Sequence, residues 1–195
     1  MAQERRKNRI KILSYLFAAV VALSLTTAIQ FLVRPSNTTL VPFAIPLPNG
    51  SLFVAFLVTI IPFYHGATLA LTNVSLLRTR RLLHLSNFGM LLIEAMIFYT
   101  MALSLSSING FITWFAILMF ADCAWVTFIH IAGGSDDQAP KKWAYVNFGM
   151  AVALVLLSIF ATDKRIATNL TYLVGLAAVT RTILDYSLTW QYYFD

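Results

Sequence analysis

The sequence predicts an all-α fold, a polytopic integral membrane bundle of about six transmembrane helices that forms one domain over residues 1–195. Composition is the first reason, because 59% of the 195 residues are hydrophobic and only 11% are charged, against roughly 45–50% and about 25% in soluble domains. The second reason is that the apolar runs reach the ~20 residues needed to cross a bilayer. Six such spans leave no room for a soluble catalytic domain.

The apolar runs between polar residues or Gly and Pro breaks define the expected spans. The first run follows a basic stretch at residues 5–11, as a secretory signal does. It is longer than the about 7–15 residues of a signal's apolar core, and no small-residue cleavage site follows it. We therefore expect a retained first helix. The expected spans are 11–33, 51–76, 86–108, 111–132, 143–162 and 166–190.

Glycine and proline predict how some of these spans begin, bend or end. Asn109 and Gly110 interrupt the apolar pattern, so we expect a turn over residues 106–110. The segment 34–50 contains four prolines, which exclude a regular helix and favour a cap across the mouth of the bundle. Pro62, followed one turn later by Gly66, predicts a kink in the second span that frees backbone carbonyls to face a cavity.

The distribution of Lys and Arg predicts the orientation of the bundle. With the N-terminus inside, the inside segments hold ten of the fourteen Lys and Arg residues, the outside segments hold three, and Arg181 lies within a span. Because cytoplasmic loops are enriched in Lys and Arg, we expect both termini in the cytoplasm and a location in the plasma or inner membrane. The aromatic residues expected in the inner interfacial belt are Trp143, Tyr145, Trp190, Tyr192 and Tyr193.

The net charge of +6 does not indicate nucleic-acid binding, because the basic residues form short clusters beside apolar runs. The partners that we expect are the lipid bilayer, further copies of the chain in a homo-oligomer, and a soluble cytoplasmic protein. Cys123 is the only cysteine, so one chain cannot form a disulfide or a cysteine metal site. The candidate residues for contact with lipid or partner are Arg78, Arg80, Arg81, Lys141 and Lys142.

Five ionisable side chains lie inside the expected spans and are the candidate ligand- or ion-binding residues. An ionised Asp, Lys or Arg at the centre of a transmembrane helix costs about 2.5–3.5 kcal/mol, so such groups usually face the bundle interior and mark a site. The five lie five to eleven residues from the inner ends of their spans, which is about 7–17 Å of helix. They can therefore meet in one layer. They are His65, Glu94, Asp122, Arg181 and Asp185.

The spacing of these residues predicts how they pair. Arg181 and Asp185 are four residues apart and can pair on their own helix. Glu94 and Asp122 are then left with His65 as their candidate cation. Two ionised carboxylates beside one imidazole are unfavourable in a low dielectric, so either one carboxyl carries a proton or a bound cation supplies the missing charge.

These residues favour a membrane transport protein or channel that binds or relays a cation or proton in the inner half of the bilayer. The alternative is a membrane-embedded sensor or assembly subunit that docks a soluble partner through the basic loops, with the buried charges serving only packing. A weaker alternative is a metal-dependent intramembrane enzyme that uses the same acids with His65. The sequence contains no HExxH, GxSxG or Gly-rich phosphate motif. A role other than catalysis is therefore favoured, and neither a metal nor a cofactor is assigned.

In its size, its span count and the spacing of Ala18 and Ala22 in the first span, the chain resembles the substrate-binding components of energy-coupling-factor vitamin transporters. The resemblance implies a small helical bundle that presents a small-residue face on its first helix. The intramembrane acids and the basic second loop have no match in that family's pattern, so no site residue is carried over from it.

Overall fold

The computed structural model describes residues 2–32, 47–72, 81–133, 139–161 and 164–194, with side chains over 14–31, 50–69, 86–131, 141–161 and 166–194. Within these ranges every regular element is a helix. Six of the helices are long and apolar enough to cross a membrane. The helices are α1 (Ala2–Leu32), α2 (Leu47–Thr72), α4 (Arg81–Leu103), α5 (Ile108–Gly133), α6 (Ala139–Phe160), α7 (Lys164–Leu188) and the short α8 (Trp190–Phe194).

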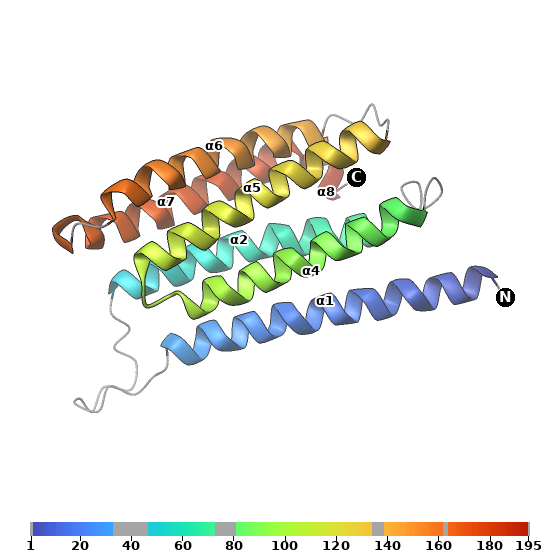
Figure 1. Cartoon of the computed structure of the whole chain (residues 1–195), viewed down its shortest axis with the longest axis horizontal. Coiled ribbons are helices and arrows are strands. Elements are labelled where there is room, and N and C mark those ends of the chain that lie inside the picture. The colour runs from blue at the N-terminus through green and yellow to red at the C-terminus, as the bar shows by residue number, and fades with distance from the viewer. Residues whose placement is uncertain (1, 33–46, 73–80, 134–138, 162–163, 195) are drawn as a thin grey trace.

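The six long helices form a closed ring in which each packs against two neighbours. In order around the ring they are α1, α4, α5, α6, α7 and α2, and the contact between α2 and α1 closes it. Contacts of α2 with α4 and of α5 with α7 cross the centre. The two ends of the chain lie at the same end of the bundle (Figure 1), which we call the terminal end. The short α8 packs there against α2 and α7.

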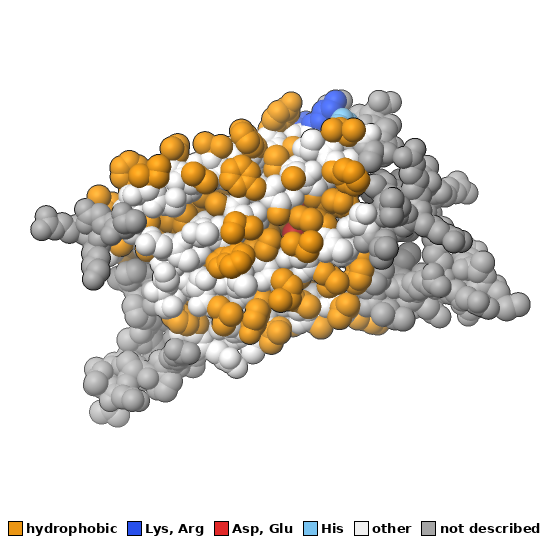
Figure 2. All heavy atoms as spheres, viewed as in Figure 1, with side chains coloured by type: hydrophobic (Ala, Val, Ile, Leu, Met, Phe, Trp, Pro, Cys, Tyr) orange, Lys and Arg blue, Asp and Glu red, His pale blue; other side chains and the backbone are white. Residues whose placement is uncertain are grey.

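The outside of the ring is hydrophobic, as a bilayer requires. Figure 2 shows hydrophobic side chains spread over one face of the bundle among white backbone and other side chains, with a small group of Lys or Arg side chains at its upper edge. Large apolar side chains on several helices are well exposed, among them Ile61, Ile131, Ile159 and Leu176. In water such a surface would drive aggregation, whereas lipid solvates it.

The turn between α4 and α5 comes earlier than the sequence predicts. Residues 104–107 make the turn, and α5 already begins at Ile108. The reason is that Ser107 caps the helix, since its Oγ accepts a hydrogen bond from the backbone N–H of Gly110 at 3.3 Å. Asn109 and Gly110 therefore lie in the first helical turn, and the prediction that they form the turn itself is wrong.

Proline also interrupts α2 less than the sequence predicts. The helix begins at Leu47 and includes Pro48, because a proline in the first turn removes only an N–H that has no helical acceptor. The last four residues of the segment 34–50 are therefore helical, and 33–46 lie outside the described residues. The helix also continues through the buried Pro62.

The carbonyl that Pro62 leaves without a helical donor is that of Val58, four residues earlier. It does not face a cavity. The Thr182 hydroxyl of α7 donates a hydrogen bond to it at 2.7 Å. Nearby, the Ser51 hydroxyl of α2 donates to the Thr171 carbonyl at 2.8 Å. A Cβ on Gly175 would lie 2.5 Å from the Ser51 Oγ, so a glycine at this position permits the close approach of α2 and α7.

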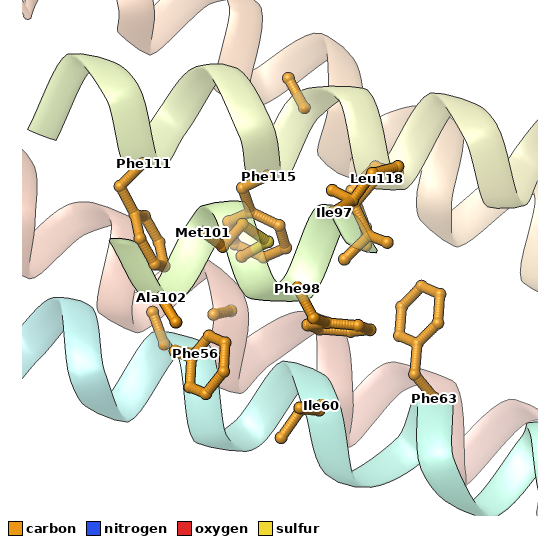
Figure 3. Close-up of a cluster of buried hydrophobic side chains, with 14 of the residues drawn as sticks. Phe56, Ile60, Phe63, Ile97, Phe98, Met101, Ala102, Phe111, Phe115 and Leu118 are labelled. Atoms are coloured by element: carbon orange, nitrogen blue, oxygen red, sulfur yellow. The ribbon is translucent and has the colours of Figure 1, made fainter. Parts of the chain in front are cut away.

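Phenylalanine rings fill the space between α2, α4 and α5 (Figure 3). The ring of Phe98 on α4 meets those of Phe56 and Phe63 on α2 edge-to-face, with centroids 6.1 and 5.2 Å apart. This is a favourable aromatic geometry. The apolar core therefore occupies one side of the interior of the helix ring. Phe63 lies at its border with the buried polar side chains that are described below.

Candidate functional site

A cluster of polar and charged side chains lies between α4, α5, α6 and α7, which we call the polar cluster. Each of the four helices contributes within its candidate membrane span. Most members are almost completely buried, with 3% of Glu94, 0% of Asn147, 5% of Arg181 and 2% of Asp185 exposed, whereas Asp122 is half-buried. The cluster consists of Glu94, Asp122, Asn147, Arg181 and Asp185.

Asn147 connects the two charged parts of the polar cluster. Its side-chain oxygen accepts hydrogen bonds from Arg181 Nε at 3.0 Å and from Arg181 Nη2 at 2.8 Å. Its Nδ2 donates to Asp122 Oδ2. A neutral amide thus joins α5, α6 and α7, and each end of it meets a group of suitable polarity.

The Arg181 guanidinium has an amide, a carboxylate and an aromatic ring around it, although its Nη1 makes no hydrogen bond within the described residues. Its Nη1 lies 3.3 Å from Asp185 Oδ2, an ion pair within one helix. Its central carbon lies 5.1 Å from the centre of the Phe63 ring, which is a cation–π distance. Together with the two bonds to Asn147, these contacts make Arg181 the centre of the polar cluster.

Asp185 has several partners besides Arg181. The Thr189 hydroxyl donates a hydrogen bond to the backbone carbonyl of Asp185 at 2.5 Å. The same hydroxyl lies 3.4 Å from Oδ1 of the Asp185 side chain. The Tyr193 hydroxyl approaches Asp185 Oδ2 at 3.5 Å. Burial, followed by the nearby charge of Asp185, raises the pKa of Tyr193 well above its usual range. Tyr193 therefore stays protonated and remains a donor to Asp185.

Glu94 and Asp122 form the acidic side of the polar cluster. Each carboxyl group lies within electrostatic reach of the other, and two like charges side by side in a low dielectric favour a proton on one of them. Glu94 Oε1 is buried without a hydrogen-bond partner among the described residues. Unlike Asp185, Glu94 therefore has unused bonding capacity.

The charges of the polar cluster do not balance. Glu94, Asp122 and Asp185 supply three carboxyl groups, and Arg181 pairs directly with only one of them. Isolated charges in a low-dielectric interior are strongly unfavourable. Glu94 and Asp122 have no direct counter-charge, so their negative charges must be compensated by bound protons or cations.

The structure places His65 outside the polar cluster. Its Nδ1 lies 3.5 Å from the Tyr186 hydroxyl, and its ring packs on that of Tyr193 with centroids 4.7 Å apart. The sequence predicts His65 as the cation beside Glu94 and Asp122, but the link to Asp122 comes from Arg181 through Asn147. The arrangement differs because His65 and Glu94 lie on helices that meet across the apolar core.

The aromatic residues at the terminal end divide into two groups. Tyr145 is 76% exposed and Trp190 is 58% exposed, as an interfacial belt requires. Tyr193 is only 8% exposed, because α8 turns it towards His65 and Asp185. Tyr192 contacts the Trp143 ring with centroids 4.5 Å apart. The expectation of a shared belt is therefore wrong for Tyr193, which belongs to the interior.

The basic residues predicted to contact lipid or a partner are only partly described. Arg78 and Arg80 lie outside the described residues, as does the side chain of Arg81. Lys141 and Lys142 are exposed at the start of α6. Lys142 donates to the Leu188 carbonyl at 3.0 Å, where a cation complements the C-terminal end of α7.

Asn147 is not among the site residues that the sequence predicts, because that prediction rests on the ionisable side chains within the spans. A detectable signal exists, since Asn147 is an amide inside an otherwise apolar run, and such side chains usually hydrogen-bond across helices. Asn87 on α4 gives the same signal, and its Oδ1 accepts a bond from Trp125 Nε1 at 3.1 Å. Nothing in the sequence indicates the role of Tyr193.

The candidate metal ligands do not gather into one site. Within the described ranges, no group of three or more His, Cys, Asp or Glu side chains is arranged to hold a metal ion. His65 is separated from the acids by its aromatic neighbours, which leaves carboxyl, amide and guanidinium groups as the chemistry of the polar cluster.

No family model, curated protein or solved structure matches this chain.

Proposed function

We propose that this chain is a membrane transport protein that takes up and passes on a proton at Glu94 and Asp122, in the inner half of the bilayer. The proposal includes an orientation with both termini in the cytoplasm, supported by the ten-to-three distribution of basic residues and by the position of both termini at one end.

The observation that carries the proposal is the unpaired acidic side of the polar cluster. Glu94 is 3% exposed, its Oε1 has no partner among the described residues, and its neighbour is another carboxyl group. A proton shared between the two carboxyl groups removes one of their two negative charges and the direct repulsion between them. Intramembrane carboxyl groups of this kind form proton relays in pumps and transporters.

Asn147 gives a way for protonation to affect helix packing. When Asp122 is ionised, it accepts the Asn147 Nδ2 donor, and this bond keeps the amide oxygen on Arg181. A proton on Asp122 weakens that bond, because a neutral carboxyl is a poorer acceptor. The hydrogen-bonded connection between α5, α6 and α7 is then weaker. The position of the proton therefore biases the packing of these helices.

The test is proton flux into proteoliposomes that contain a trapped pH-sensitive dye. Purified protein is reconstituted, a pH gradient and a counter-ion path are imposed, and the initial rate is compared with that of empty liposomes. We expect the double variant Glu94→Gln/Asp122→Asn to fall to the empty-liposome rate. Flux equal to that of the unchanged protein would refute the proposal.

Matched controls separate the loss of these acids from a general change in charge. Glu4→Gln and Asp136→Asn make the same substitutions outside the candidate spans and are expected to keep full flux. The intrinsic fluorescence of the four tryptophans and far-UV circular dichroism establish that each variant is folded. A folded double variant without flux supports the proposal.

A second function is favoured by the other side of the polar cluster. The contacts of Arg181 with Asp185 and Asn147 need no ligand, as in a charge network that only specifies packing. The chain would then serve as a sensor or assembly subunit that docks a soluble protein through its basic loops. Charge reversal at Arg78, Arg80 and Arg81 would abolish co-purification of that protein, while Glu94→Gln would leave it unchanged.

A further inference from the structure

A groove separate from the polar cluster lies between α1, α2 and the end of α7. Its volume is about 480 Å³, and its walls consist of four apolar residues of α1, five residues of α2, and Tyr186 of α7. This volume falls within the roughly 300–1,000 Å³ of pockets that hold small molecules. All ten lining residues lie inside candidate membrane spans. Two of them, Ile61 and Tyr64, are exposed on the outside of the ring, so the groove opens on the apolar outer surface and we expect its occupant to come from the membrane.

The polar residues of the groove lie towards one end of it. The Phe17 ring of α1 stacks on the Tyr64 ring of α2 with centroids 5.9 Å apart, which places these residues at the same level. From that level, His65 and Thr68 continue towards the terminal end. In the opposite direction the lining is apolar and includes Val21, Leu25 and Ile60. The groove thus has a polar end and a longer apolar end.

We propose that this groove binds a single-chain amphiphile with a small uncharged oxygen headgroup, such as a long-chain alcohol or a protonated fatty acid. The headgroup lies at His65 and Tyr186, and the chain follows Val21, Leu25 and Ile60. The Tyr186 hydroxyl and His65 Nδ1 lie 3.5 Å apart, at the long limit of a hydrogen bond, so a headgroup hydroxyl beside them can accept from the Tyr186 hydroxyl and donate to the ring nitrogen. This proposal does not depend on proton transport.

The position of the polar end excludes larger and charged headgroups. His65 lies four residues inside the end of the candidate span Gly50–Leu69, which is about 6 Å of helix. A phospholipid headgroup stays at the interface, and a charged headgroup at this depth would lose its hydration without a fixed counter-charge. A small neutral headgroup can enter and keep its hydrogen bonds.

The test is photo-crosslinking of the full chain in phosphatidylcholine nanodiscs. The probe is hexadecanol with a diazirine in the chain and an alkyne for detection. We expect labelling at residues 18–25 and 60–68 that unlabelled hexadecanol abolishes. The nanodisc supplies phospholipid in large excess. If phospholipid occupied the groove, unlabelled hexadecanol would not reduce the labelling by the probe. Labelling that is spread evenly over the lipid-facing helices would overturn the proposal.

Two variants sharpen the result. Ala22→Trp fills the groove and is expected to reduce the competed labelling by about tenfold or more, whereas Leu23→Trp, at an exposed α1 position outside the lining, leaves it unchanged. His65→Phe removes one hydrogen bond to the headgroup, so we expect it to weaken the binding of hexadecanol by about three- to tenfold. It leaves a hexadecane probe unaffected. Equal effects of Ala22→Trp and Leu23→Trp, or of His65→Phe on both probes, would contradict the assigned site.

Discussion

The two sides of the polar cluster differ in how completely their charges are paired. On one side, Asp185 has Arg181 at 3.3 Å and accepts further contacts from Thr189 and Tyr193. On the other side, Glu94 meets another carboxyl group and keeps a buried oxygen without a partner among the described residues. Glu94 and Asp185 are equally buried, so the difference lies in the chemistry of their neighbours.

This difference teaches that burial alone does not distinguish a structural charge from a functional one. A buried charge that has its counter-charge beside it needs no ligand, and removing one partner is strongly destabilising. A buried acid beside another acid is stable only when a proton or cation is bound. The first side therefore holds the helices together, and the second is the one expected to exchange a proton.

The largest expected effect comes from removing the only cation of the polar cluster. Arg181→Leu leaves Asp185 buried without its counter-charge, so we expect a loss of about 3–5 kcal/mol in the free energy of unfolding. Unfolding in mixed micelles with increasing dodecyl sulfate, followed by circular dichroism, measures it. The double variant Arg181→Leu/Asp185→Leu is expected to regain most of the loss, because it no longer buries the Asp185 carboxylate without its counter-charge. A double variant as unstable as Arg181→Leu would mean that Arg181 acts chiefly through Asn147.

A smaller loss of stability is expected when an uncharged hydrogen bond made by α7 is removed. Thr182→Val leaves the Val58 carbonyl without a donor, since Pro62 has no N–H. The expected loss is about 1–3 kcal/mol in the free energy of unfolding, measured in the same assay. In a Pro62→Ala background the helix supplies its own N–H, so Thr182→Val should then cost less. Identical losses in both backgrounds would show that the Thr182 methyl packing, and not the hydrogen bond, is what matters.

The smallest expected effect is on the acidic side. If Glu94 carries a proton, then Glu94→Gln replaces one neutral group by another of the same shape, and we expect a change below about 1 kcal/mol in the free energy of unfolding. Asp185→Asn is the matched comparison and should be much more destabilising, because it leaves Arg181 without its carboxylate. Equal losses for the two variants would remove the distinction between the two sides.

Much of the fold could be predicted from the sequence because lipid imposes simple requirements on a spanning helix. Six apolar runs correspond to the six candidate spans, since each run must be long enough to cross the bilayer. The errors occur where a local contact decides the outcome. Ser107 moves the start of α5 to Ile108, and Pro48 is accepted in the first turn of α2, although prolines and Asn-Gly usually indicate a break.

The candidate site was only partly predictable for a similar reason. Depth along a helix can be counted from the sequence, and Glu94, Asp122, Arg181 and Asp185 do lie together. The side of the bundle that each helix faces depends on the order of helices around the ring. That order places α4, α5, α6 and α7 consecutively and puts α2 on the other side of α7. His65 is therefore among aromatic rings and away from the acids.

By itself, the sequence determined that this chain is a bundle of membrane helices with ionisable groups at one level, because hydrophobicity and helical rise are properties of each segment alone. Only the tertiary structure decided that Asn147 joins Asp122 to Arg181, that Thr182 meets the carbonyl freed by Pro62, and that His65 borders a groove. These relations depend on which helices are neighbours and how they are rotated. Helix neighbours are chosen by the packing of all six helices together, and no single segment contains that information.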